Sequence, residues 1–169
     1  MKDFNTKELS SMEQAQMAEI YDRLHDSVYR TALTYCRNVP DAEDIMHDVF
    51  LARFGREGTF PDAETEKAWM LRVTINRCKD LLKSSRRTRH VPLEEAETVC
   101  IENEAEREVY EAVNALPVRY RMVVHLYYFE GYTVKEIGEL TGTSESAVQT
   151  QLYRARKLLR TALGEEFTP

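Results

Sequence analysis

Residues 133–160 read TVKEIGELTGTSESAVQTQLYRARKLLR, and this stretch decides the fold of the carboxy-terminal half of the chain. Thr133 and Glu136 have the spacing of a capping box, so a short helix is predicted to begin there. Gly142 ends that helix, and Ser144 can cap the next one. Two helices joined by a turn of about four residues that contains glycine form a helix-turn-helix.

The second helix of this pair has a polar and basic outer face. Its apolar residues repeat at spacings of four, three and four and form the buried face. These residues are Val148, Leu152, Ala155 and Leu159. The side chains left outside are Ser146, Gln149, Thr150, Tyr153, Arg154, Arg156, Lys157 and Arg160. An ordinary amphipathic helix with a solvated face would also explain this pattern. Because no acidic residue follows Glu145 in the helix and the preceding helix is correctly spaced, we favour a DNA-recognition helix.

The geometry of a recognition helix divides these side chains into two groups. The amino-terminal part of such a helix meets base edges, and its far end lies along the sugar-phosphate backbone. Gln149 and Thr150 can hydrogen-bond bases, and Tyr153 can contact a thymine methyl group. Arg154 can reach guanine or phosphate. The expected phosphate contacts are Arg156, Lys157 and Arg160.

The chain carries a formal net charge of −6, which by itself would repel DNA. The charge is unevenly distributed, however. Lys and Arg number 7 against 14 Asp and Glu in residues 1–66, 8 against 1 in 67–90, 1 against 8 in 91–112, and 7 against 6 in 113–169. A basic stripe in the middle and a basic helix near the end therefore carry any affinity for DNA. We expect the free protein to bind DNA poorly unless a partner protein contributes further positive charge near the DNA.

Helical periodicity also dominates the first half of the chain. Its apolar stripes are Ile20, Leu24, Val28, Ala32 and Cys36, then Ala42, Ile45, Val49 and Ala52, and then Ala68, Leu71, Ile75, Cys78 and Leu82. No segment alternates at period two over more than a few residues, so an all-α fold is predicted. The periodicity fails between Ser84 and Asn103, where a basic run and then an acidic run suit a solvated linker. We predict two small helical domains, residues 1–84 and 104–169, joined by a flexible linker over 85–103.

Several classes of protein are excluded by features that the sequence lacks. No stretch approaches the roughly 20 apolar residues that span a bilayer, and the start lacks the apolar core of a signal peptide. A cytoplasmic protein without membrane insertion is therefore expected. The 3 cysteines are widely spaced without a CxxC pair, which argues against a disulfide framework or a zinc site. The histidines share no catalytic motif and no glycine-rich phosphate loop is present, so no enzyme activity, metal or cofactor is expected.

The basic stripe in the middle of the chain favours contact with nucleic-acid phosphates. Its cationic face consists of Arg72, Arg77, Lys79 and Lys83, which would contact phosphates. Trp69 is expected in the core.

Three motifs occur in order along the chain. They are RNVPDAEDIMHDVFLARF, KAWMLRVTINRCKDLLKSSRR and LPVRYRMVVHLYYFEGYTVKEIGELTGTSESAVQTQLYRARKLLR. Together they resemble the sigma-70 family of RNA polymerase sigma factors, and more narrowly its extracytoplasmic function (ECF) subfamily, which has only regions 2 and 4. The resemblance covers residues 18–163. It implies a factor that binds core RNA polymerase, recognises and melts promoters, and starts transcription.

The resemblance implies a polymerase surface in the first half of the chain. The DAED run, residues 41–44, corresponds to the segment that docks on the clamp helices of the β′ subunit. Local structure alone would also explain this run, because Asp41 can cap a helix there. The expected core-polymerase contacts are Asp41, Glu43, Asp44 and Asp48. A second contact, with the β flap, is also expected.

The resemblance also implies DNA contacts and a protein partner. Residues 58–67 match the loop that captures a flipped base of the −10 element, with Phe60 in a family-like position. Asn76 aligns with a residue that lines the pocket for that base. Residues 149–154 align with those that recognise the −35 element. Relatives are commonly held by a membrane-anchored anti-sigma factor, so a similar partner is expected.

The sequence departs from the family pattern at three positions. Gln149 and Gln151 stand where relatives commonly carry Lys or Arg, which weakens phosphate anchoring, and His47 stands where Gln is common. A self-sufficient helix-turn-helix regulator is the competing hypothesis, but that class usually binds as a dimer and no dimerisation helix is evident. We expect the two domains to be mobile in the free protein, so that a partner can clamp them together over their DNA-binding faces.

Overall fold

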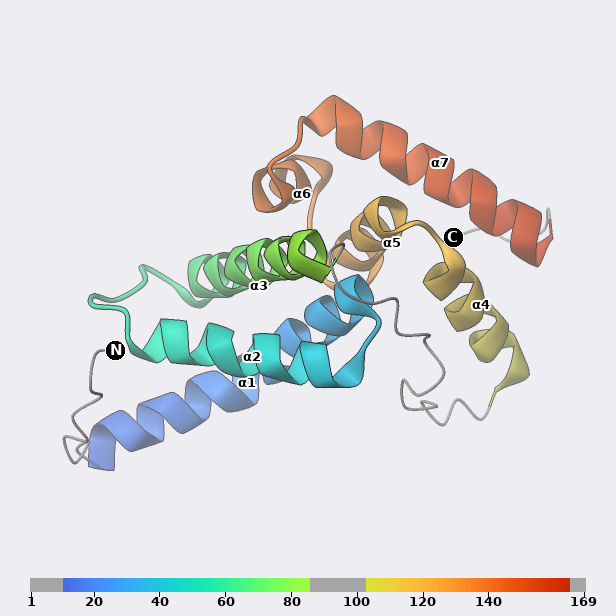
Figure 1. Cartoon of the computed structure of the whole chain (residues 1–169). Helices are drawn as coiled ribbons and strands as arrows, with labels where there is room; N and C mark the ends of the chain where they lie inside the picture. The colour runs from blue at the N-terminus through green and yellow to red at the C-terminus, as the bar shows by residue number, and fades with distance from the viewer. Residues whose placement is uncertain (1–10, 86–102, 165–169) are drawn as a thin grey trace.

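The structure, a computed structural model, describes residues 11–85 and 103–164, and every regular element in these ranges is a helix. The elements are α1 (Ser11–Cys36), α2 (Val39–Phe54), α3 (Ala63–Ser85), α4 (Glu104–Ala115), α5 (Val118–Val124), the π-helix η1 (His125–Phe129), α6 (Val134–Thr141) and α7 (Glu145–Leu163) (Figure 1). The predicted all-α fold is confirmed. The predicted linker falls almost entirely outside the described residues, between the end of α3 and the start of α4.

Helices α1, α2 and α3 pack on one another through the apolar stripes that the sequence predicts. Most members of these stripes are buried, among them Leu24, Val49 and Ile75. The stripe members at the helix ends, such as Cys36 and Leu82, are half-buried. These three helices therefore form a small bundle.

The start of α2 differs from the sequence-based interpretation. Asp41 does not cap this helix, because Asn38 occupies the cap position and its side chain accepts a hydrogen bond from the Asp41 amide at 2.9 Å. The helix begins earlier than the DAED run suggests, with Pro40 in its first turn, where proline costs no hydrogen bond. Asp41 therefore does not cap the helix. The remaining local explanation for its charge is its position near the positive end of the helix dipole.

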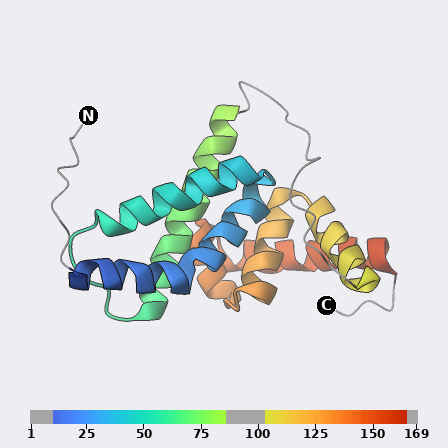
Figure 2. The same ribbon diagram turned by 90° about the horizontal axis from the view of Figure 1, so that it is seen from below.

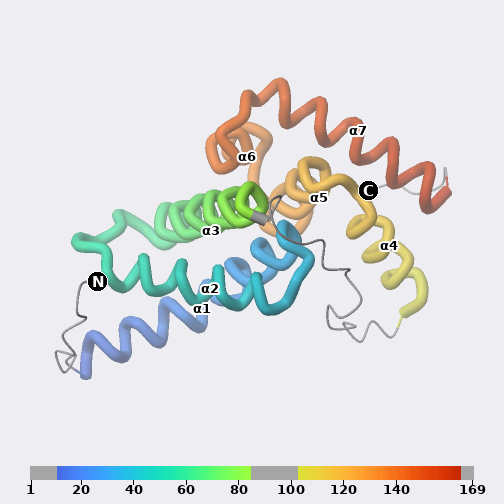
Figure 3. The backbone as a smooth tube through the Cα atoms, in the orientation of Figure 1, coloured from blue at the N-terminus to red at the C-terminus, as the bar shows by residue number. Residues whose placement is uncertain are grey.

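The helix-turn-helix of the second half follows the predicted caps. Thr133 and Glu136 form the capping box at the start of α6. Gly142 ends α6 in the left-handed conformation, with φ of 70°, and Ser144 accepts a hydrogen bond from the Ala147 amide at 3.1 Å as the cap of α7. Helix α7 packs on α4, α5 and α6, and it lies on the side of the molecule away from α1 and α2 (Figure 3).

The two halves of the chain pack directly against each other. Helix α5 lies against α1, and α6 lies against α3, as Figures 1 and 2 show. One cluster of buried apolar residues runs through both halves and includes Val28 and Ile75 from the first and Met122 and Leu126 from the second. The two halves thus share a core in this structure.

Polar groups also cross between the halves. The Arg121 guanidinium, which is buried, donates to the carbonyl oxygen of Thr34 at 2.6 Å. Desolvation lowers the pKa of Arg121 to about 10, but this value still leaves the group charged at neutral pH. Lys79 Nζ on α3 donates to the carbonyl oxygen of Thr141 at the end of α6, at 2.6 Å. The packed arrangement is therefore held by directed hydrogen bonds as well as by apolar contact.

Candidate nucleic-acid interface

The outer face of α7 is arranged as the sequence predicts. The four apolar positions of its stripe are all buried. Exposed side chains are Ser146, Gln149, Thr150, Tyr153, Arg154, Lys157 and Arg160, and Arg156 is half-buried. Tyr153, at 66% exposure, is among the most exposed aromatic side chains in the described ranges. A large apolar ring in that position costs free energy in water unless a partner covers it, which suits a recognition surface.

On one side of α7, Arg156 contacts the π-helix η1. Arg156 Nε donates to the Tyr128 hydroxyl at 2.8 Å, and its guanidinium lies 5.7 Å and 5.8 Å from the ring centroids of Tyr127 and Tyr128. Arg156 is thus positioned by the protein itself before any DNA arrives. The sequence predicts a phosphate contact at this residue but gives no sign of its tyrosine partners.

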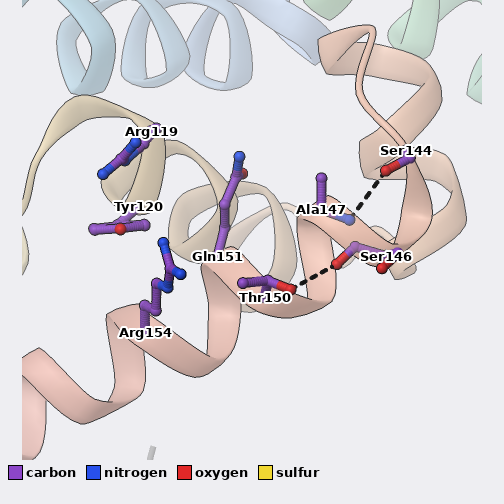
Figure 4. A pocket seen from close by; sticks show the side chains of 8 residues that line it. All are labelled: Arg119, Tyr120, Ser144, Ser146, Ala147, Thr150, Gln151 and Arg154. Atoms are coloured by element: carbon purple, nitrogen blue, oxygen red, sulfur yellow. Dashed lines mark hydrogen bonds between the residues drawn. The ribbon is translucent and has the colours of Figure 1, made fainter.

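The other flank of α7 borders a cavity of about 340 Å³ beside the start of α5 (Figure 4). Arg119 and Tyr120 line the cavity from α5, and Arg154 lines it from α7. The Arg119 guanidinium lies 4.7 Å from the centroid of the Tyr120 ring. A hydrogen bond with Arg154 lowers the pKa of Tyr120, against the opposing effect of burial. The sequence interpretation misses Arg119 and Tyr120, because only the packing of α5 on α7 brings them beside the recognition helix.

The predicted basic face of α3 is only partly available for contact with DNA. Arg72, Asn76 and Lys83 are exposed, and spacings of four and seven residues put them on one side of the helix. Arg77 forms an ion pair with Asp48 of α2 at 3.1 Å. The structure therefore joins a residue predicted to contact DNA with one predicted to contact polymerase. Lys79 is half-buried against α6, as described above.

The segment between α2 and α3 is a cluster of aromatic and cationic side chains. The Phe60 ring lies 5.6 Å from the Trp69 ring, and the Arg56 guanidinium lies 4.5 Å from the Phe60 centroid. Both rings are half-buried, so Trp69 belongs to this cluster and is not enclosed in the core. Asn76 is seven residues beyond Trp69, or about 10 Å along the helix axis. No described contact joins Phe60 and Asn76 in one pocket.

The acidic end of α2 faces solvent. Glu43, Asp44 and Asp48 are exposed, and Asp41 is half-buried. The spacing of 41, 44 and 48 places three carboxylates along one strip of the helix. A negative strip of this kind fits a basic partner surface, and apart from the Asp48–Arg77 pair no described cation forms an ion pair with it.

Two kinds of feature are absent from residues 11–85 and 103–164. No helix there is long and apolar enough to cross a membrane. No group of three or more His, Cys, Asp or Glu side chains there could hold a metal ion.

Comparison with known proteins identifies both halves of the chain. The model for sigma-70 region 2 matches residues 20–88, and the model for sigma-70 region 4 matches residues 106–159. The RNA polymerase sigma factor SigV of Bacillus subtilis is 32% identical over 141 residues, covering 82% of this chain and 85% of SigV. The ECF RNA polymerase sigma factor SigM of Mycobacterium tuberculosis is 28% identical over 149 residues, covering 86% of this chain and 76% of SigM.

Solved structures show the same fold. The sigma factor RpoE of Bartonella quintana, determined with the anti-sigma factor NepR, matches with a TM-score of 0.70 at 16% identity, over 90% of this chain and 99% of RpoE. CnrH, determined with the cytosolic domain of CnrY, matches with a TM-score of 0.63 at 23% identity, over 91% of each chain. With two sigma regions in order and sigma factors similar along most of its length, this chain belongs to the ECF sigma factors of the sigma-70 family, which bind core RNA polymerase and direct promoter recognition and transcription initiation.

Proposed function

We propose that this sigma factor divides promoter recognition between α7, which contacts the −35 element, and α3 with the Phe60 segment, which holds the melted −10 element. The outer face of α7, which has no acidic residue after Glu145 and belongs to a correctly capped helix-turn-helix, carries the proposal. Within that face, Gln149, Thr150 and Tyr153 contact bases, and Lys157 and Arg160 contact phosphates.

At the −10 element, the exposed strip of α3 holds the opened strand. Arg72 and Lys83 contact phosphates, and Asn76 hydrogen-bonds the edge of an unpaired base. Phe60 is covered by Arg56 in the free protein, so base stacking requires Arg56 to turn away, toward the phosphates of the same strand. Melting is then favoured because an unpaired base gains contacts that a paired base cannot make.

The packed arrangement of the two halves is proposed to be the polymerase-free state. The −10 and −35 elements are more than about 20 base pairs apart, or ~70 Å along B-DNA. In the packed chain, α3 contacts α6, and α6 contacts α7. The two helices that are proposed to bind DNA, α3 and α7, are therefore separated by only one helix. The halves must separate to span the promoter, and separation also releases Lys79 for DNA.

The polymerase and regulatory partners complete the proposal. The acidic strip of α2 docks on the β′ clamp helices, and region 4 contacts the β flap. Two solved relatives were determined with an anti-sigma factor or with the cytosolic domain of a partner protein. An anti-sigma factor that holds this chain in the cytoplasm is proposed by analogy.

The polymerase contact is tested by charge reversal at Asp44. Asp44→Lys should weaken binding to core polymerase at least tenfold while the helical circular dichroism signal is retained, because Asp44 is exposed and caps nothing. The matched control is Asp26→Lys, an exposed charge reversal on α1. Competition binding against a labelled reference sigma factor measures both variants. Equal affinities for wild type and Asp44→Lys would remove the acidic strip from the interface.

The −35 assignment is tested with reconstituted holoenzyme on a library randomised at that element. Gln149→Ala should cost roughly 1–3 kcal/mol at particular base pairs and relax the preference there. Lys157→Ala should weaken binding to all sequences alike and reduce the salt slope by about one. The reverse pattern would show that α7 lies in the groove in another orientation.

A further inference from the structure

The cavity between α5 and α7 contains two arginines without an acidic partner. Arg119 and Arg154 form no ion pair with any carboxylate in the described part of the chain. Some arginines of the protein are neutralised by carboxylates: Arg53 is paired with Glu66, and Arg107 with Glu111. In a protein with a net charge of −6, two adjacent cations that are left unneutralised mark a site for an external anion.

The protein orients these two cations before any ligand binds. The Arg119 guanidinium lies over the Tyr120 ring at 4.7 Å, and this cation–π attraction holds the group beside α7. Tyr120 is 6% exposed, so the ring is a fixed support. Figure 4 shows the Arg154 side chain directed from α7 toward Tyr120, on the same side as Arg119. Two planar donor groups therefore face one space of about 340 Å³.

The rest of the lining suits a phosphate group. Ser146 and Thr150 contribute hydroxyl groups from the first turns of α7, and Gln151 contributes an uncharged amide. Thr150 donates its hydroxyl hydrogen to the Ser146 carbonyl oxygen at 3.0 Å. Its donor is therefore occupied in the free helix, and the arginines supply the main charge. Glu145, the acidic residue that begins α7, does not line the cavity.

The position of the cavity indicates which phosphate it would meet. A helix with its side chains is about 10–12 Å across, and the major groove is about 12 Å wide, so the flanks of an inserted helix lie against the two phosphate backbones. Arg156 with Tyr128 stands on one flank of α7, and Arg119 with Arg154 on the other. Guanidinium groups match phosphate oxygens with two parallel hydrogen bonds.

We propose that the cavity between α5 and α7 is a seat for one backbone phosphate of the −35 duplex, with Arg119 and Arg154 as its charged donors. The proposal rests on the proposed entry of α7 into the major groove. It adds a DNA contact from α5, outside the helix-turn-helix, and assigns Arg154 to phosphate instead of guanine. A contact of this kind fixes the register of α7 and carries no base preference.

The first test measures holoenzyme binding to the −35 library at several salt concentrations. Arg119→Ala should weaken binding to all sequences by roughly 3- to 10-fold near 0.15 M salt and reduce the salt slope by about one. Arg119→Lys should keep the salt slope, because it keeps the charge, and lose part of the affinity, because it lacks the planar fork. Arg107→Ala, an exposed arginine on α4, is the matched control and should leave both quantities unchanged.

The second test locates the phosphate. Each phosphate of the −35 duplex is replaced in turn by an uncharged methylphosphonate, and wild type is compared with Arg119→Ala and Arg154→Ala. At one position the replacement should weaken wild-type binding but have little further effect on either variant. Thermal unfolding of the free variants checks that α5 and α7 remain folded.

The outcomes separate this inference from the proposed function. If holoenzyme shows no dependence on the −35 sequence, the proposed function of α7 fails. If that dependence is present but Arg119→Ala keeps the wild-type salt slope and responds to every methylphosphonate as wild type does, only the seat fails. A changed base preference in Arg119→Ala or Arg154→Ala would also overturn it, because that result would show base contact.

Discussion

His125 is a buried histidine at the contact between the two halves of the chain. Its Nε2 lies 3.1 Å from the Thr31 hydroxyl and 3.6 Å from a Glu130 carboxylate oxygen. Glu130 also accepts a hydrogen bond from Ser27 at 3.0 Å and forms an ion pair with Lys67 at 3.0 Å. Desolvation lowers the pKa of His125 to about 4, although Glu130 acts in the opposite direction. The imidazole is therefore neutral in the folded protein at physiological pH.

This lowered pKa predicts a pH dependence of stability. Between about pH 4 and pH 6.5 the unfolded chain binds a proton at His125 that the folded chain does not, so stability is complete above pH 6.5 and falls as the pH falls. From pH 7 to pH 5 the loss from this residue should be about 2 kcal/mol. Urea unfolding measures it. His125→Gln should remove this part of the pH dependence, and His47→Gln, at an exposed position on α2, should retain it. Equal slopes for wild type and His125→Gln would refute the assignment.

Glu66 is the buried carboxylate that ties α1, α2 and α3 together. It accepts hydrogen bonds from Arg23 at 2.6 Å and from Arg53 at 2.5 Å. Burial by itself would raise the pKa of Glu66, but the hydrogen bonds and charges of the two arginines outweigh it and lower the pKa. This group fixes the first turn of α3 to α1 and α2.

Loss of the Glu66 charge should be far more costly than loss of a surface charge. Glu66→Gln leaves two arginines without their anion and should reduce the free energy of unfolding by about 3 kcal/mol. Asp26→Asn removes an exposed pair with Arg30 and should cost less than about 0.5 kcal/mol. Denaturant unfolding of both variants gives the comparison. A similar cost for the two would show that the buried pair contributes no more than a surface pair.

At the scale of elements, the helix-turn-helix depends on a close backbone approach within its turn. Gly138 of α6 is buried, and a Cβ added there would lie 2.8 Å from the carbonyl oxygen of Thr143. The obstacle is backbone, so no side-chain movement can relieve it. Any side chain at this position must push α6 and α7 apart or shift the turn.

Gly138→Ala should therefore impair −35 recognition without a direct DNA contact. We expect a loss of roughly 1–3 kcal/mol in stability, although alanine favours helix more than glycine does. Binding of the holoenzyme to −35 sequences should weaken, and binding to core polymerase through α2 should not. Glu139→Ala, at the exposed neighbouring position, is the control. An unchanged or raised stability in Gly138→Ala would show that the turn can move without cost.

At the scale of the whole molecule, the packing of the halves makes the free protein compact. The expectation of domains that are mobile in the free protein differs from this packed structure, in which the halves would separate only when a partner competes for their surfaces. The contact contains a shared apolar cluster, the His125 and Glu130 network, and the Arg121 hydrogen bonds. Such a surface holds two domains together more firmly than a linker alone.

Small-angle scattering of the free protein tests this arrangement. The radius of gyration should be roughly 16–18 Å, close to the value for a single compact domain of this length. Glu130→Gln removes the anion that Lys67 and Ser27 contact and should increase the radius. Glu139→Gln, an exposed change on α6, should not. A profile that requires two independent bodies in wild type would favour the mobile arrangement in free solution.

The sequence by itself determined the helical fold and the caps of α6 and α7. The box formed by Thr133 and Glu136, the cap at Ser144 and the buried face that contains Leu152 could all be predicted, because caps and apolar periodicity depend on residues within one or two turns. The exposed face of α7 follows from its buried face. The sigma family was recognisable for a similar reason, since its motifs are contiguous in the chain.

Only the tertiary structure decided which polar side chains are neighbours. Arg119 joins Arg154, and Lys79 donates to Thr141, because helices distant in sequence pack together. Exposed polar residues carry no periodic signal that names a partner, and several conformations satisfy them equally well in water. The cap of α2 shows the same limit at short range: both Asn38 and Asp41 could serve as the cap, and the path of the chain after α1 places Asn38 there.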